Sequence, residues 1–257
     1  MVLDVTKNKG VAVLKFNRPE KFNSFNQTLA FAVQKALDDC AKDEKIRAIV
    51  LTGEGKAFCA GQDLAEAVDP KGPPLQSIVA KHYNPIIERI RNIEKPIIAA
   101  VNGVAAGAGA NIALACDIVI AKKSAKFIQA FSSIGLIPDS GGTFFLPRLV
   151  GTQKALALMM TGDRVSADEA EAMNMIYKAV EDESFDDFLG SFCDKIALMP
   201  TKGLGLTKKA VNASFSNDLT QQLALEEKLQ TEAGNSEDFK EGTTAFLEKR
   251  KPIFKGK

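Results

Sequence analysis

Three short apolar segments, separated by stretches with helical periodicity, set the strongest limit on how this chain can fold. They are residues 46–51, 96–101 and 117–121, each short and apolar enough to be a buried strand. Strands that alternate with helices usually pair in parallel through right-handed crossovers. The pattern therefore predicts an α/β core.

The segments around these strands complete the predicted organisation. Residues 2–6 and 11–16 indicate an N-terminal hairpin, and residues 26–41 and 76–93 have helical spacing. From about residue 185 to residue 249 the pattern predicts three or more amphipathic helices. We therefore expect a catalytic core over residues 1–199 and a helical region over residues 200–257.

Charge and cysteine content exclude several classes of protein. The 33 basic and 32 acidic residues nearly cancel, which argues against a partner such as nucleic acid or an anionic membrane surface. Four cysteines without metal-ligand spacing and a single histidine argue against a zinc site, so we expect no metal. The chain shows neither a signal-peptide pattern nor a membrane-spanning apolar run, and we expect a soluble cytoplasmic protein.

Several familiar nucleotide-binding and catalytic motifs are absent from the sequence. Residues 53–57 lack the first glycine and the hydroxyl residue of a P-loop, and residues 103–109 lack the glycine spacing of a dinucleotide fold. His82 lies in a helical pattern and is expected to be a partly exposed helix residue. Cys59 is most simply a small buried residue, so a histidine-activated nucleophile is not indicated.

Two glycine-rich turns carry a functional signal. Residues 58–64 and 102–110 each follow a predicted strand and precede a predicted helix. Such turns can leave backbone N–H groups pointing at a ligand. Asp63 as a helix cap, and tight packing of small residues in the second turn, are equally good explanations. Together the turns suggest an oxyanion hole, in which one lost donor costs roughly 2.7–4 kcal/mol of barrier.

Five ordered motifs over nearly the whole chain resemble the crotonase (enoyl-CoA hydratase/isomerase) family. They lie at residues 17–25, 58–64, 101–110, 134–143 and 246–250. The resemblance implies a spiral of ββα turns with a C-terminal helical trimerisation region, and hence a homotrimer or a hexamer. It implies an acyl-CoA substrate, with coenzyme A as part of the substrate and no separate cofactor. It also implies that the N–H groups of Gln62 and Ala108 are the oxyanion donors.

The resemblance further implies which residues contact the substrate. In this sequence they are Lys21, Phe22, Ala60, Gly61, Gln62, Asp63, Leu64, Ala108, Phe131, Phe246 and Lys249. Phe246 and Lys249 would contact coenzyme A from this subunit or from a neighbouring one. A solvated, mobile terminus explains the basic tail equally well.

The carboxylates separate the possible reactions. Hydratases of the family have two glutamates, and this chain has Asn111 and Phe131 at those positions. The remaining acid is Asp139, which by its sequence context alone is more simply a helix N-cap. The resemblance instead places Asp139 against the acyl group, as the single acid of an isomerase. Burial beside Phe131 and Ile134 would raise the pKa of Asp139 and make it a better base.

We therefore predict an isomerase that moves a proton with one aspartate. The loop at residues 68–73 and the segment at residues 83–85 look like those of family members that act on ring-epoxide acyl-CoA. That likeness implies conversion of the epoxide to an oxepin-CoA and Δ3–Δ2 isomerisation of enoyl-CoA. A different hydratase or thioester hydrolase, and a non-catalytic acyl-CoA-binding subunit, remain as alternatives.

Overall fold

The computed structural model describes residues 1–257 and confirms the spiral of ββα turns. Six strands form one sheet in the order β1-β2-β3-β5-β7-β10, and four form a second in the order β4-β6-β8-β9. Each turn of the spiral sends one strand to each sheet. The successive pairs are β3 (Ala48–Gly53) with β4 (Ala57–Cys59), β5 (Ile97–Val101) with β6 (Val104–Ala106), and β7 (Ile118–Lys122) with β8 (Lys126–Ile128).

The larger sheet contains the predicted hairpin and the three predicted strands. β1 (Leu3–Asn8) pairs antiparallel with β2 (Val11–Phe16), and β2, β3, β5, β7 and β10 then run parallel. The first buried strand begins at Ala48, two residues later than its apolar run suggested. The chain closes both sheets with β9 (Arg164–Ser166) and β10 (Lys178–Val180).

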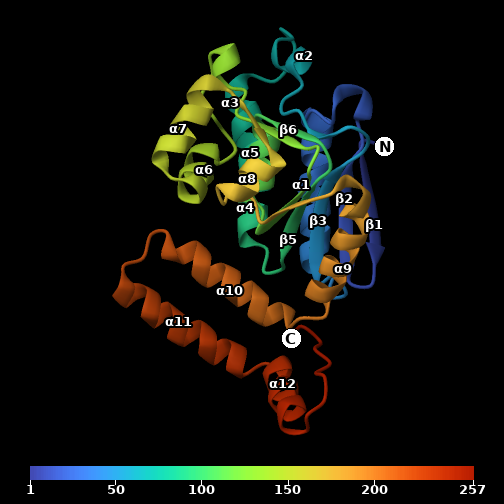
Figure 1. The fold of residues 1–257 in the computed structure, drawn as a ribbon, viewed down its shortest axis with the longest axis vertical. Coiled ribbons are helices and arrows are strands. Elements are labelled where there is room, and N and C mark those ends of the chain that lie inside the picture. Colours follow the sequence, from blue (N-terminus) through green and yellow to red (C-terminus); the bar gives the residue numbers. More distant parts are fainter.

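Helices connect the strands and cover the sheets (Figure 1). The connecting elements are α1 (Gln27–Lys42), α2 (Leu64–Ala67), α3 (Leu75–Ser77), α4 (Asn84–Asn92), α5 (Ala108–Ala115), α6 (Gly142–Val150), α7 (Thr152–Thr161), α8 (Ala167–Ala172) and α9 (Phe185–Ala197), with 3-10 turns η1 (Pro19–Lys21), η3 (Ser132–Ile134) and η4 (Asp182–Ser184). The helix predicted over residues 76–93 contains a π-helical segment, η2 (Ile78–Tyr83). Ser166 and Glu169 form the predicted capping box of α8.

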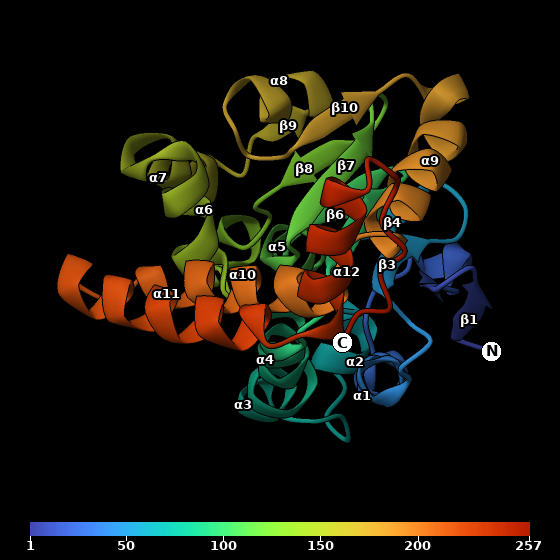
Figure 2. The same cartoon turned by 90° about the horizontal axis from the view of Figure 1, so that it is seen from below.

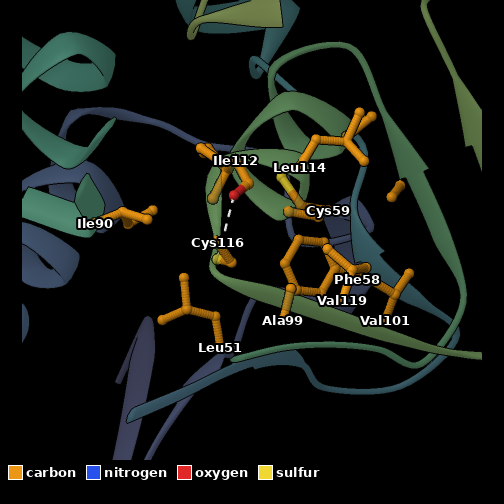
Figure 3. Packing of buried hydrophobic residues seen from close by; sticks show 14 of the residues in the cluster. Leu51, Phe58, Cys59, Ile90, Ala99, Val101, Ile112, Leu114, Cys116 and Val119 are labelled. Atoms are coloured by element: carbon orange, nitrogen blue, oxygen red, sulfur yellow. Dashed lines mark hydrogen bonds between the residues drawn. The ribbon is translucent and has the colours of Figure 1, made fainter. Parts of the chain in front are cut away.

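The main hydrophobic core combines large aromatic side chains with small ones such as alanine and cysteine. Figure 3 shows Phe58 and Cys59 of β4 packed near Leu114 of α5, with the Cys116 thiol bonded to the Ile112 carbonyl. All eight residues of α5 are buried. A helix that is buried on every side fixes the position of its own first turn.

Three further helices follow the core and form the predicted C-terminal helical region. They are α10 (Thr201–Ser214), α11 (Leu219–Gly234) and α12 (Glu237–Leu247), and we call them the helical tail. α10 and α11 run side by side in both views (Figures 1 and 2). α10 begins just after residue 200, where the sequence suggested a boundary; the division into two domains stays a prediction.

Candidate active site

Three segments that follow neighbouring strands of the smaller sheet meet at one edge. β4 pairs in parallel with β6, and β6 pairs in parallel with β8. The carboxyl ends of parallel strands lie at the same edge of a sheet, where ligands of α/β proteins usually bind. The two glycine-rich turns follow β4 and β6, and the segment leading to Asp139 follows β8.

The first turn leaves one backbone donor free. Gly61 has φ of +92°, a left-handed conformation that glycine adopts without strain. Its carbonyl accepts from the N–H of Phe25 at 2.7 Å, and the Phe25 carbonyl accepts from the N–H of Asp63 at 2.8 Å. The N–H of Gln62, between these bonds, donates to no group of the protein. It is therefore available to a ligand.

The second turn brings another backbone donor to the same place. Ala108 is the first residue of α5, where an N–H has no partner inside the helix, and Gly107 supplies no side-chain cap. A Cβ built on Gly61 would lie 3.5 Å from the Ala108 nitrogen. The two turns are thus in direct contact, and the predicted donors Gln62 and Ala108 belong to one site.

A buried ion pair fixes the first turn. The Arg18 guanidinium donates to the Asp63 carboxylate at 2.8 Å and to the Ser24 carbonyl at 2.6 Å. Asp63 also caps α2 by accepting from the N–H of Ala65, as the simpler sequence interpretation proposed. Burial alone would raise the pKa of Asp63, but the Arg18 guanidinium more than offsets it and the net pKa is lowered. Asp63 is therefore a structural anion.

The predicted contact residues before α1 lie beside the same turn. The N–H of Ala60 donates to the Phe22 carbonyl at 3.0 Å, which brings Lys21 and Phe22 next to residues 60–64. Phe22 and Leu64 are both about half exposed, with apolar surface free. The segment offers apolar surface and a lysine at the rim of the site.

The side chain of Gln62 is held on both sides. Its Oε1 accepts from the buried hydroxyl of Tyr83 at 2.8 Å, and its Nε2 donates to Glu66 at 3.0 Å. Tyr83 ends the π-helical segment η2, and such segments are frequent at functional sites. These contacts orient the residue that carries one of the two free N–H groups.

Asp139 does not cap a helix, so the simpler sequence interpretation is wrong. Ser140 and Gly141 both have positive φ, and α6 begins only at Gly142. Gly141 is at the cap position, without a side-chain cap bond. The Asp139 carboxylate instead accepts from the Ser140 hydroxyl at 2.9 Å. It is free of the structural task that the sequence suggested.

The environment of Asp139 suits a base. Burial raises the pKa of its carboxyl, while the bonds from the Ser140 hydroxyl and from its own N–H lower it by less. No lysine, arginine or histidine forms an ion pair with it. A half-buried carboxylate without a counter-ion is a stronger base than an exposed one.

Phe131 and Ile134 behave differently from each other. Phe131 is buried, and its Cζ lies 3.9 Å from where a Cβ of Gly107 would be. Ile134, predicted to line the pocket, is 52% exposed in η3. Phe131 therefore adjoins the second turn, while Ile134 faces solvent in this chain.

Phe246 and Lys249 lie apart from the other predicted contact residues. They lie at the end of α12, which Figure 1 places at the opposite end of the long axis from α2. Phe246 is 83% exposed. Phe246 and Lys249 do not reach the site of their own chain. Contact with coenzyme A from a neighbouring subunit stays a prediction.

His82 and Cys59 are structural. His82 is buried rather than partly exposed, with its ring edge against Phe31 at a centroid distance of 5.4 Å. Burial lowers the pKa of His82, so the neutral form is favoured. Cys59 is buried as predicted, and burial raises the pKa of its thiol to about 12. Neither residue is an activated nucleophile or its base.

Sequence reasoning missed the roles of Tyr83, Ser140 and Gln129. Each acts through a contact with a residue distant in sequence or through an unusual backbone angle. The only available signal was the Pro-Asp-Ser-Gly-Gly run around Ser140, whose two glycines indicate a tight turn.

Comparison with known proteins gives a consistent family. Residues 6–257 match the model of the enoyl-CoA hydratase/isomerase family. The chain is 48% identical over 252 residues to the 1,2-epoxyphenylacetyl-CoA isomerase of Escherichia coli K12, covering 97% of this chain and 96% of that one. It is 36% identical to the trans-2-decenoyl-[acyl-carrier-protein] isomerase of Streptococcus mutans, with the same coverage.

Solved structures agree with this result. The crystal structure of an enoyl-CoA hydratase from Bacillus anthracis superposes with a TM-score of 0.92 at 32% identity, over the full length of both chains. No helix of the present chain combines the length and the apolarity needed to cross a membrane.

Proposed function

The chain belongs to the enoyl-CoA hydratase/isomerase family, and from this premise we propose that it is an acyl-CoA isomerase with one catalytic carboxylate, Asp139. One observation supports the proposal most strongly. The half-buried Asp139 carboxylate, which has no counter-ion, follows the same edge of the smaller sheet as two free N–H groups. The remaining acids near the first turn are engaged: Asp63 binds Arg18, and Glu66 binds Gln62.

On a 3-enoyl-CoA the proposed reaction moves one proton along the acyl chain. The N–H groups of Gln62 and Ala108 hold the thioester oxygen while Asp139 removes a proton from C2, and the electron pair moves to that oxygen as an enolate. Asp139 then returns the proton to C4, so that a C3=C4 double bond becomes C2=C3. No atom is gained or lost. The raised pKa of Asp139 makes its carboxylate a better base for the removal of the proton.

The same residues disfavour hydration. Water addition in this family would use two glutamates, and the matching positions hold Asn111 and Phe131. The Asn111 amide is already bonded to the Asp139 carbonyl and to Gln129, and Phe131 offers no acid or base. One carboxylate can shuttle a proton, but this site has no second group to activate water.

The physiological substrate that we propose is the ring-1,2-epoxide of phenylacetyl-CoA, which would be converted to the isomeric oxepin-CoA. The 48% identity over nearly the whole chain to a protein named 1,2-epoxyphenylacetyl-CoA isomerase supports this choice. Δ3–Δ2 isomerisation of enoyl-CoA is the second activity, because a movable proton beside the thioester is all that it requires.

Assembly completes the proposed site. We place Phe246 and Lys249 of a neighbouring subunit against coenzyme A, in a homotrimer or a dimer of trimers. The exposed Phe246 and its distance along the molecule from the site of its own chain support that arrangement. Lysine suits the phosphates of coenzyme A as a point charge.

The test is incubation with the ring-epoxide phenylacetyl-CoA and, separately, with a 3-enoyl-CoA, followed by mass and ultraviolet spectra. We expect products of unchanged mass, with turnover about 10²–10⁴-fold lower in Asp139→Asn. Asp163→Asn, at an exposed position, is the matched control and keeps full activity. The mechanism is excluded if Asp139→Asn turns over normally.

Other products would identify the other functions. Addition of one water would indicate a hydratase, and release of free coenzyme A a thioester hydrolase. Binding of acyl-CoA without any turnover, unchanged in Asp139→Asn, would indicate a non-catalytic subunit.

A further inference from the structure

A fully buried carboxamide connects the two halves of the proposed site. Asn111 Nδ2 donates to the backbone carbonyl of Asp139 at 2.8 Å, and that carbonyl also accepts from the N–H of Gly142 at 2.9 Å. Asn111 itself is 0% exposed. Both acceptor positions of the Asp139 carbonyl are therefore occupied.

The orientation of this carboxamide is forced by its neighbours. A carbonyl oxygen can only accept, so the NH₂ group of Asn111 must face Asp139 and its oxygen must face away. That oxygen accepts from Gln129 Nε2 at 2.8 Å, which leaves the buried Gln129 Oε1 without a partner. An unsatisfied buried acceptor is unfavourable. This arrangement keeps a donor on the Asp139 carbonyl and leaves the Gln129 oxygen without one.

Asn111 also has a particular place in its helix. It lies in α5 three residues after Ala108, whose N–H is one of the proposed oxyanion donors. A Cβ on Gly142 would lie 2.3 Å from Asn111 Nδ2, so α6 approaches this side chain as closely as glycine allows. α5 therefore carries both the proposed oxyanion donor, the N–H of Ala108, and Asn111, whose side chain is bonded to the backbone of Asp139.

The loop needs to be held because its backbone is strained. Ser140 has φ of +52° although it is not glycine, and it is buried. Such a conformation is strained for a residue other than glycine and persists only when surrounding contacts impose it. The bond from Asn111 is one of the contacts that can impose it.

We propose that Asn111 is a positioning residue, which fixes the Asp139 carboxylate at a set distance from the oxyanion donors through its bond to the Asp139 backbone. The inference rests on the proposed function, since it assigns Asn111 a role in presenting the proposed base. Asn111 acts through Asp139 and does not touch the reacting atoms. Loss of its donor removes no reacting group but lets the Asp139 carboxylate move.

The test compares Asn111→Ala, Asp139→Asn and the double variant on a 3-enoyl-CoA. Misplacement of a catalytic group by about 1 Å costs up to about 10²-fold. We expect Asn111→Ala to lower kcat about 10–100-fold with KM changed less than about threefold. Because Asn111 acts through Asp139, the double variant is no slower than Asp139→Asn alone.

A matched control separates positioning from general loss of structure. Asn212 of α10 also donates a carboxamide bond to a backbone carbonyl, that of Arg91 at 2.8 Å, and accepts from the Arg91 guanidinium. Asn212→Ala should lose stability and keep its kcat. Should Asn111→Ala not fold, Asn111→Leu fills a similar volume but has no donor, and the same comparison applies.

The outcomes are distinct for the two proposals. Wild-type kcat in Asn111→Ala together with an inactive Asp139→Asn overturns the positioning role alone. Losses that multiply in the double variant overturn it as well, because they show that Asn111 acts independently of Asp139. An active Asp139→Asn overturns the proposed function, and the positioning role with it.

Discussion

α5 and α11 show two opposite ways in which this chain uses a helix. α5 has eight residues, all buried, and its first N–H lies at the candidate site. α11 has 16 residues, of which only Leu229 is buried. α5 is short, made of small side chains and covered on every side by its own chain. α11 is long and leaves most of its surface uncovered.

The uncovered surface of the helical tail is in part apolar. A groove of about 990 Å³ lies between α10 and α11, lined by Leu204, Val211 and Leu223 among others. Leu219, Leu223 and Phe246 are more than half exposed. Exposed apolar area of this kind marks surfaces that another molecule covers. The difference is that α5 is covered by its own chain, whereas the helical tail leaves apolar surface that the proposed assembly would cover.

Ala108→Pro tests the proposed role of the first N–H of α5 and has the largest expected effect. Proline is tolerated at the first position of a helix but has no N–H, so one oxyanion donor disappears while α5 is kept. We expect kcat/KM to fall by about 10²–10³-fold. Steady-state kinetics on a 3-enoyl-CoA check it. Thr152→Pro, at the first position of α7, is the control and should remain active.

In α11, Leu223→Asp should disrupt the proposed trimer or hexamer. An aspartate at this half-exposed apolar position would place a charge where the proposed subunit contact excludes water. Sedimentation velocity should show a shift from the trimer or hexamer to monomer. Val5→Asp, on the exposed edge strand, should leave the assembly unchanged. A monomeric wild-type protein would contradict the assigned role of the tail.

Arg18→Ala tests how much the ion pair with Asp63 stabilises the folded protein. The Arg18 and Asp63 side chains are only 12% and 13% exposed, so removal of one partner leaves a poorly solvated charge. We expect the free energy of unfolding to fall by about 3 kcal/mol in urea titrations. The exposed pair of Lys35 with Asp39 is the control, and Lys35→Ala should cost about 0.5 kcal/mol or less.

The same pair has a defined pH dependence. The pKa of Asp63 is lowered in the folded protein, so the stability that it contributes is present above the unfolded pKa near 3.8 and is lost as the pH falls through the folded pKa. The difference between wild type and Arg18→Ala should therefore shrink in acid. A difference that stays constant down to the lowest pH would contradict the ion pair as its source.

The smallest expected effect is a gain in stability. The pKa of Asp139 is raised above 3.8 in the folded protein, so folding disfavours its charged form and stability from this group is lost as the pH rises through the folded pKa. Asp139→Asn should thus melt at a slightly higher temperature than wild type at pH 7, with the gain vanishing below pH 3.8. Wild-type turnover should likewise rise with pH as Asp139 loses its proton.

The sequence predicted five of the six strands of the larger sheet, all but β10, and none of the smaller sheet. β3, β5 and β7 have five or six residues each and are visible as apolar runs. β4, β6 and β8 have three residues each, too few to show any periodicity. Their strand character depends on pairing with one another, and only the family resemblance implied it. The site lies on this smaller sheet.

The sequence identified several residues of the candidate site but not the hydrogen bonds between them. The two glycine-rich turns and Asp139 could be identified because their residue types are unusual at those positions. The Tyr83–Gln62 bond joins residues 21 apart, and the Asn111–Asp139 bond joins residues 28 apart, so no local pattern indicates either. His82 was predicted to be a partly exposed helix residue, but it lies in a π-helical segment and is buried.

The division of the site among successive turns of the spiral has a consequence for how such enzymes can diversify. In the proposed site, main-chain N–H groups that follow the first two strands of the smaller sheet bind the thioester, and they depend little on the side chains. The acid comes from the third. A few substitutions in one segment could therefore supply new reactivity while recognition of the activated carbonyl is inherited unchanged.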